Sequence, residues 1–351
     1  MKVLHVLDSF NIGGAENLVT NYILETKDKQ VNDAIILFKS NSFLREKLEY
    51  ERINIVDLSD YNILIKLIKL IKFVKKEKYD IVHAHLFPAF YLCAISSVFT
   101  RDTKYIMTEH SVTNKRRNKK YFKTIEKFIY KRFDKVIACA EEVNINLRNW
   151  LDNEIDIKTV RNGVKNSPLK KYKYEYDLIL IGSLRSNVKG VDLLLKSLSQ
   201  IRNKFKKAVI VGDGIEKENL IKLRNSLELS EKVEFLGIRS DIEYLLDKSK
   251  IFVMPSRYEG LPIALLEAMS RKKAIIASNV SCIPDILDYG ECGIVIEPEN
   301  IRELSKAIKE LLGDDERISL LGNNAYKKFI DNYSLEIYCN EIDKIYRTVV
   351  K

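Results

Sequence analysis

The sequence predicts an α/β protein made of two doubly wound domains. Three observations support this: the chain has 351 residues, short apolar runs alternate with helical patterns along nearly all of it, and the alternation is interrupted once, near residues 161–176. A chain of this length is about twice a usual single domain. Strands that alternate with helices form mostly parallel sheets with right-handed crossovers. The composition, 46% hydrophobic and 31% charged, is typical of a globular protein and excludes disordered or collagen-like chains.

The predicted strands form two series, one on each side of the interruption. The first begins with the apolar run 2–8, which precedes Gly13-Gly14 and a helical pattern. The remaining strands of the first series are 33–38, 53–57, 79–84, 104–108, 135–138 and 157–160. Those of the second series are 177–182, 207–212, 232–236, 250–254, 273–277 and 293–296.

The interruption sets the expected domain boundary. Ser167-Pro168 and the Lys/Tyr-rich stretch 170–176 break the pattern, so we expect one domain over 1–167 and a second over 168–334. A C-terminal helix of about 335–351 is expected to pack back on the first domain. In such sheets, ligands bind at the carboxyl ends of the strands, where we expect the chemistry.

The charge and the cysteines narrow the class of protein. The net charge is +10, and residues 1–168 hold most of it, with 29 Lys and Arg against 21 Asp and Glu. Such a half can meet nucleic acid, an anionic membrane surface or a phosphorylated substrate. The five cysteines, an odd number, contain no C-x-x-C pair and indicate a reducing compartment without a disulfide framework or structural zinc.

Two basic segments lie in this half. A helix over 62–76 places Lys66, Lys69, Lys72 and Lys76 on one side, which is either a solvated face or a face that docks on a membrane or an acceptor. The run 115–120 has the same two interpretations, and we expect a mobile basic loop near an anionic ligand there. The sequence shows no secretory signal, and the uncharged run 81–100 is broken by His, Pro and Ser, so we expect a soluble chain.

The most informative motif is the stretch 255–269, which follows an apolar strand. Pro262 fits the first position of a helix, and Gly260 allows the backbone to approach a ligand closely. The amides at such a helix start favour phosphate. Glu259 lies just before this helix and Glu267 one to two turns inside it, so both carboxylates can line one pocket.

With these residues in view, the chain resembles the retaining GT-B glycosyltransferases of family 4, the group 1 enzymes. Glu259 and Glu267 are similar to their E-x7-E signature, and further motifs follow in the family's order along nearly the whole chain. These are Gly13-Gly14-Ala15-Glu16, Thr108-Glu109-His110, Arg161-Asn162-Gly163-Val164, Gly182-Ser183-Leu184-Arg185, Lys189-Gly190, Val211-Gly212-Asp213-Gly214 and Phe235-Leu236-Gly237. The resemblance implies two Rossmann-like domains facing a central cleft.

The resemblance also implies roles for individual residues. Lys189 matches the family's pyrophosphate lysine, and Arg185 is expected to replace an arginine that the family often has where this chain has Ser183. Fixed cations aimed at a leaving diphosphate stabilise the transition state. Glu259 would hold sugar hydroxyls and Glu267 the ribose. The other expected donor-binding residues are Gly14, Gly182, Gly260 and Leu261, which offer backbone amides, and Arg239, which would lie near the nucleobase.

The histidines have competing interpretations. His83 and His85 alternate on a strand and share a face, which raises zinc binding, but the sequence offers no third ligand at a suitable spacing. We therefore predict no metal site. His110 is expected to contact the transferred sugar or the acceptor, against the alternative of a hydrogen-bonded structural histidine. The chain contains no D-x-D motif, which agrees with metal-independent activation by protein cations.

Together these features predict a retaining, metal-independent hexosyltransferase without a cofactor. It would move a hexose or N-acetylhexosamine from a nucleotide-diphosphate sugar, with UDP as the expected nucleotide, to a glycan or lipid-linked acceptor in cell-surface polysaccharide synthesis. We expect a cytoplasmic protein, peripheral on an anionic inner membrane face, that does not bind nucleic acid. The alternatives are a nucleotide-sugar epimerase or phosphorylase of the same architecture and a non-enzymatic, basic nucleic-acid-binding protein.

Overall fold

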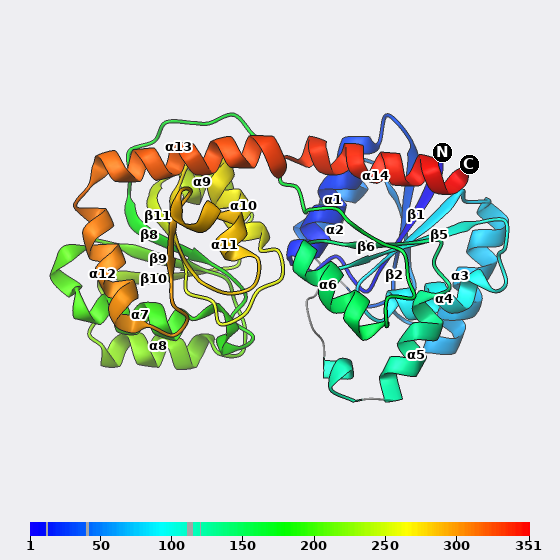
Figure 1. Cartoon of the computed structure of the whole chain (residues 1–351), viewed down its shortest axis with the longest axis horizontal. Helices are drawn as coiled ribbons and strands as arrows, with labels where there is room; N and C mark the ends of the chain where they lie inside the picture. The colour runs from blue at the N-terminus through cyan, green and yellow to red at the C-terminus, as the bar shows by residue number, and fades with distance from the viewer. Residues whose placement is uncertain (12, 40–41, 111–114, 120) are drawn as a thin grey trace. The chain divides into compact units, whose positions relative to one another are not determined.

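The chain divides into two compact α/β units, which the computed structural model in Figure 1 shows. The structure describes residues 1–11, 13–39, 42–110, 115–119 and 121–351. The first unit consists of Met1–Gly163 and Leu335–Lys351, and the second of Val164–Ser334. Each unit contains one parallel sheet, as the alternation of apolar runs and helical patterns predicts.

The sheet of the first unit has seven parallel strands. In spatial order they are β3 (Asn54–Asp57), β2 (Val31–Ile36), β1 (Lys2–Leu7), β4 (Ile81–His85), β5 (Lys104–Glu109), β6 (Lys135–Ala138) and β7 (Ile157–Thr159). The chain builds outward in one direction from β1 and in the other from β4. The junction of these two strands is therefore the topological switch point, where such sheets bind ligands.

Helices cover this sheet in two groups. α1 (Gly14–Thr26) contacts α2 (Phe43–Tyr50) and α14 (Leu335–Val350), while α4 (Ala89–Ser97) contacts both α3 (Ile63–Glu77) and α5 (Tyr121–Tyr130). Right-handed crossovers place the two groups on opposite faces of the sheet, which Figure 1 shows. The remaining segments are the single-turn helix η1 (Lys115–Asn118) and α6 (Glu141–Trp150).

The sheet of the second unit has six parallel strands. In spatial order they are β10 (Val233–Gly237), β9 (Ala208–Val211), β8 (Tyr176–Ile181), β11 (Ser249–Met254), β12 (Ala274–Ser278) and β13 (Ile294–Ile296). The switch point lies between β8 and β11. Leu and Ile side chains of these strands form a buried core with α7, α12 and α13.

The helices of the second unit lie between successive strands, except for the last two, which follow β13. They are η2 (Asn187–Lys189), α7 (Val191–Gln200), η3 (Arg202–Lys204), α8 (Lys217–Ser226), α9 (Ile242–Asp247), α10 (Ile263–Ser270), α11 (Ile283–Ile286), η4 (Asp288–Gly290), α12 (Ile301–Leu312) and α13 (Asp315–Asn332). Side-chain caps fix several starts: Asn300 accepts from the amide of Glu303, and Asp314 from that of Arg317. A bridge between Val164 and Ser334 places the two ends of this unit side by side.

The observed strands lie within two residues of the predicted ones, because buried parallel strands are continuous apolar runs in the sequence. The helix predicted over 62–76 is α3, but its lysine face is only partly solvated. Lys66 is buried, and its ammonium donates to the carbonyl of Leu37 at 2.5 Å. Lys69 lies over the ring of Tyr61. None of the helices within the described ranges is long and apolar enough to cross a membrane.

Candidate active site

The switch point of the second unit brings a lysine and a glutamate together. The segment after β8 carries Lys189 and the segment after β11 carries Glu259. The ammonium of Lys189 donates to both carboxylate oxygens of Glu259, at 2.7 and 2.8 Å, and the hydroxyl of Ser256 donates to one of them at 2.6 Å. Glu259 is 5% exposed, whereas the side chain of Lys189 is 26% exposed. The structure thus joins two predicted site residues that lie 70 positions apart.

Close backbone packing holds these two segments against each other. Gly190 has φ +65, and a Cβ there would lie 1.9 Å from the carbonyl oxygen of Pro255, so only glycine fits. Gly182 passes so close to Lys189 that an added Cβ would lie 2.9 Å from that side chain's Cγ. The glycine-rich pattern at this edge therefore places the ammonium of Lys189 beside β11.

Arg257 links the same two segments, a role that was not predicted from the sequence. Its guanidinium forms a bidentate ion pair with Asp192 at 2.8 and 3.0 Å and donates to the carbonyl of Asn187 at 2.6 Å. Its amide donates to the carbonyl of Val188 at 2.8 Å. Bidentate Arg–carboxylate pairs fix geometry as well as charge. No spacing rule connects Arg257 with Asp192, because the two residues meet only through the parallel pairing of β8 and β11.

The helix start that follows Glu259 offers backbone groups. Pro262 is the N-cap of α10, one residue before the position that the sequence predicts. The thiol of Cys282 donates to the carbonyl of Gly260 and fixes the turn that contains Leu261. Glu267 lies in the second turn of α10, where burial raises its pKa to about 7, with a smaller contribution from the charge of Glu243. Its carboxyl thus differs from that of Glu259, which has an ammonium against it.

In the first unit, two predicted residues lie at the carboxyl edge of the sheet. Gly14 is the first residue of α1, after β1, and His110 directly follows β5. Both ring nitrogens of His110 are buried, and neither has a hydrogen-bond partner among the residues that the structure describes. Burial lowers the pKa of His110 to about 4, so the ring is neutral at pH 7. Buried polar groups usually have hydrogen-bond partners, so this ring is unusual within the described part of the chain.

Two family models match the chain in succession. The model for Glycosyltransferase Family 4 matches residues 12–167, and the model for Glycosyl transferases group 1 matches residues 164–328. The chain belongs to the group 1 glycosyltransferases. A relative from Escherichia coli, a UDP-Gal:alpha-D-GlcNAc-diphosphoundecaprenol alpha-1,3-galactosyltransferase, is 26% identical over 85% of this chain and 82% of its own length.

Solved structures show the same fold. HepE of Anabaena, solved with UDP and glucose, superposes with a TM-score of 0.86 over 98% of this chain and 99% of its own, at 19% identity. A glycosyltransferase of Rickettsia africae superposes with a TM-score of 0.84 over 100% of this chain and 98% of its own, at 21% identity. The predicted GT-B fold of this glycosyltransferase is therefore confirmed.

Three buried histidines cluster beneath α14. His5 is the neighbour that the sequence missed, because it pairs with His83 only through the register of β1 and β4. One nitrogen from each of His5, His83 and His85 lies within 4.8 Å of the others. However, His83 already bonds the hydroxyls of Tyr346 and Thr108, at 2.7 and 2.8 Å. These bonds favour a structural network that holds α14 on the sheet over a metal site.

Two arginines of the basic segment 115–119 are held by contacts with the first unit. Arg117 forms an ion pair with Glu109 at 3.0 Å, and Arg116 forms one with the fully buried Glu126 at 2.8 Å. The guanidinium of Arg116 also lies 4.3 Å from the ring centre of Phe87. Lys120, the last residue of the predicted basic run, lies outside the described residues. The two arginines thus link the ends of β4 and β5 and are occupied by protein carboxylates.

Two predicted arginines lie on the surface of the second unit. Arg239 forms a bidentate ion pair with Asp241 at 2.8 and 2.7 Å. Arg185 is exposed, and within the described ranges its guanidinium has no ion-pair partner. The loop of Arg185 is fixed by Gly214, which packs against Leu184 so closely that a Cβ would lie 2.1 Å from its carbonyl carbon.

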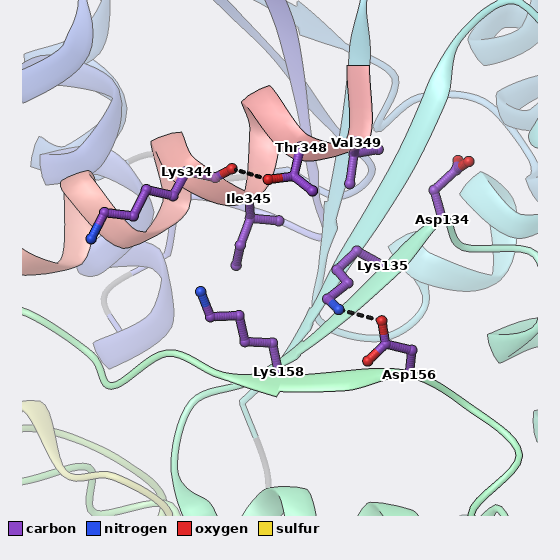
Figure 2. Close-up of a pocket in the computed structure, with 8 residues that line it drawn as sticks. All are labelled: Asp134, Lys135, Asp156, Lys158, Lys344, Ile345, Thr348 and Val349. Atoms are coloured by element: carbon purple, nitrogen blue, oxygen red, sulfur yellow. Dashed lines mark hydrogen bonds and ion pairs between the residues drawn. The ribbon is translucent and has the colours of Figure 1, made fainter. Parts of the chain in front are cut away.

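A cavity of about 390 Å³ lies in the first unit, at the amino ends of β6 and β7 (Figure 2). Figure 2 shows the ion pair of Lys135 and Asp156 on one side and α14 on the other. The residues that line it are Asp134, Lys135, Asp156, Lys158, Lys344, Ile345, Thr348 and Val349. Since parallel sheets bind ligands at the opposite edge, we assign this cavity no part in transfer.

The raised pKa of Glu267 predicts a pH-dependent stability. The unfolded chain releases this proton near the ordinary pKa of 4.5, whereas the folded chain keeps it until about 7. Folding stability from this group is therefore lost as the pH rises through this interval. We expect Glu267→Gln to raise the melting temperature relative to the wild type at pH 8 and to change it little at pH 5. Equal differences at both pH values would contradict the buried, protonated carboxyl.

Proposed function

We propose that this glycosyltransferase transfers a hexose or N-acetylhexosamine from a UDP-sugar with retention of configuration and without a metal ion. The observation that carries the proposal is the contact of Lys189 with Glu259 at the switch point, beside the start of α10. It combines a cation for phosphate with a carboxylate for sugar hydroxyls. Two findings support UDP as the nucleotide. One relative is named for UDP-galactose, and a protein of similar fold was solved with UDP and glucose.

The donor residues divide by the part of the ligand that they bind. We assign Lys189 and the exposed Arg185 to the β-phosphate, where negative charge develops as the glycosidic bond breaks. Backbone amides of Gly182, Gly260 and Leu261 would approach the phosphates and the sugar. Glu259 would accept hydrogen bonds from sugar hydroxyls and stabilise positive charge near the anomeric carbon.

The remaining assignments concern the nucleoside and the acceptor. Glu267 would accept hydrogen bonds from the ribose hydroxyls, and Arg239 would lie near the nucleobase. Gly14 would offer a backbone amide to phosphate at the start of α1. The neutral ring of His110 would contact the transferred sugar or the acceptor hydroxyl. The leaving phosphate would help to remove the proton of that hydroxyl on the same face.

A donor screen followed by product analysis tests this function. Purified protein is first melted with UDP-glucose, UDP-galactose and their N-acetylated forms, and the stabilising donor is then incubated with lipid-diphosphate-linked acceptors. We expect a product with the anomeric configuration of the donor, measured by NMR, with EDTA present throughout. An inverted product or a strict metal requirement would contradict the mechanism. Conversion of the donor without an acceptor would instead indicate an epimerase.

We also propose that the first unit docks on an anionic membrane surface, where a lipid-linked acceptor would lie. Large apolar side chains are exposed along the adjacent helices α3, α4 and α5, in the loops before α3 and α4, and just after α4. They are Tyr61, Ile63, Leu64, Ile65, Ile68, Phe87, Ile95, Val98, Phe99, Tyr121, Ile125 and Phe128. In the described second unit fewer such side chains are exposed, and no two of them are closer than five positions in the sequence. Single exposed apolar side chains are normal on a protein surface.

The lysines of α3 supply the charge complement to anionic lipids. Lys72 and Lys75 are exposed, and neither has an ion-pair partner in the part of the chain that the structure describes. By contrast, Lys123 and Lys127 of α5 are paired with Asp152. An amphipathic helix with unpaired lysines and exposed Leu and Ile is typical of a membrane-surface helix. We therefore place the main docking contact on α3.

Vesicle binding tests this surface independently of catalysis. We expect Lys72→Gln/Lys75→Gln to weaken partitioning onto equimolar phosphatidylglycerol–phosphatidylcholine vesicles at least about tenfold, because each lysine near such a surface contributes about 1 kcal/mol. Leu64→Gln/Ile68→Gln should also weaken it. The control is Leu320→Gln, an exposed apolar residue on α13 of the second unit. Equal sedimentation of all four proteins would exclude the α3 surface.

A further inference from the structure

The contact between Lys189 and Glu259 serves a second purpose beyond holding both residues in place. If the proposed function holds, the ammonium must interact with a phosphate and the carboxylate with sugar hydroxyls. In the structure the two groups instead satisfy each other, through two hydrogen bonds of 2.7 and 2.8 Å. The phosphate and Glu259 therefore compete for the same cation.

The surroundings make this competition one-sided. The carboxylate of Glu259 is almost fully buried, and Ser256 supplies its other described contact. When a buried carboxylate loses its cation, the free energy of the protein rises by a large amount unless new hydrogen-bond donors replace the cation. Lys189, by contrast, reaches the edge on a flexible side chain whose backbone is fixed by Gly190 and by the hydrogen bonds of Arg257 to η2. The ammonium can move while the carboxylate stays.

We infer that the ion pair of Lys189 and Glu259 makes this site discriminate between a nucleotide sugar and a bare nucleoside diphosphate. A nucleoside diphosphate draws the ammonium of Lys189 away and leaves the negative charge of Glu259 without a compensating cation. A nucleotide sugar draws Lys189 away as well, but its sugar hydroxyls donate to Glu259 in return. After transfer the sugar has left, Glu259 regains Lys189, and release of the nucleoside diphosphate is favoured. The inference rests on the proposed donor class and concerns the regulation of that site.

A double-mutant cycle on UDP binding, measured by calorimetry, tests this competition. We expect Glu259→Gln to tighten UDP binding about tenfold, within the usual range of coupling between sites, and to tighten UMP, which lacks a β-phosphate, little or not at all. In a Lys189→Met background the same substitution should change UDP binding by less than twofold. Such dependence on Lys189 separates competition from simple charge repulsion. The control is Glu299→Gln, which removes a carboxylate that contacts Arg257; it should leave UDP affinity within twofold of the wild type.

Three results would overturn the inference. Unchanged or weaker UDP binding in Glu259→Gln would mean that Glu259 merely orients Lys189. An equal gain with and without Lys189, or for UMP as well as UDP, would indicate general repulsion. If the wild type binds none of UDP, GDP, ADP, CDP or dTDP, the proposed donor class fails and the inference fails with it. Binding of UDP without coupling refutes the inference alone and leaves the proposed function standing.

Discussion

Lys189→Ala is expected to lower kcat/KM for transfer by about a factor of 10²–10³, the cost of removing one fixed group that stabilises a developing negative charge. The reason lies in the position of the ammonium. It is held at the switch point by the backbone of η2 and by Glu259, so it needs no reorganisation other than a change of partner when charge builds on the leaving phosphate. The measurement is the initial rate with the donor that the melting screen selects.

The design of this experiment separates chemistry from folding. In Lys189→Ala the carboxylate of Glu259 stays buried without its cation, which can destabilise the fold, so the melting temperature of each variant must be recorded. Lys189→Arg preserves the positive charge, and we expect it to keep partial activity. The matched control is Lys222→Ala, an exposed lysine on α8 of the same unit. Full transfer activity in Lys189→Ala, or an equal loss in Lys222→Ala, would remove Lys189 from the mechanism.

The strands and the order of the motifs could be predicted from the sequence because their signals are local. A buried parallel strand such as β11 is a continuous apolar run, and the turn after it is recognisable from Gly260 and Pro262 within a few positions. These two kinds of signal directed attention to Glu259, whereas Lys189 was selected through the resemblance to the family's motifs. Their direct contact was not part of that prediction.

The parts that were missed depend on which strands become neighbours. The anchoring of η2 by Arg257 requires that β8 and β11 pair, and the approach of His5 to His83 requires that β1 and β4 pair. Neither strand pairing can be recognised from the spacing of residues in the sequence. Burial of Lys66 is a further case, since only the packing of α3 against the end of β2 supplies the carbonyl that accepts its hydrogen bond. Register, and not residue type, decides such roles.

We expect substitution of Arg271 to have the largest effect on folding stability. It lies just after α10, 3% exposed, and its guanidinium forms a bidentate ion pair with the buried Asp247. It also donates to the carbonyls of Ser167 and Pro168, at 2.9 and 3.2 Å, and so anchors the chain where it enters the second unit. Removing one partner of a buried pair typically costs 3–5 kcal/mol, because the other charge remains without compensation. We expect Arg271→Met to destabilise the second unit by about this amount.

Urea unfolding can assign the loss to that unit, because Trp150, the single tryptophan, belongs to the first. In Arg271→Met, far-UV circular dichroism should show a transition at lower urea, while the Trp150 fluorescence transition keeps its midpoint. The double variant Arg271→Met/Asp247→Leu should recover much of the loss, since an apolar pair leaves no buried charge. A double variant as unstable as the single one would show that the carbonyl bonds to Ser167 and Pro168, and not the ion pair, carry the effect. A Trp150 midpoint that falls in parallel would show that the two units unfold as one.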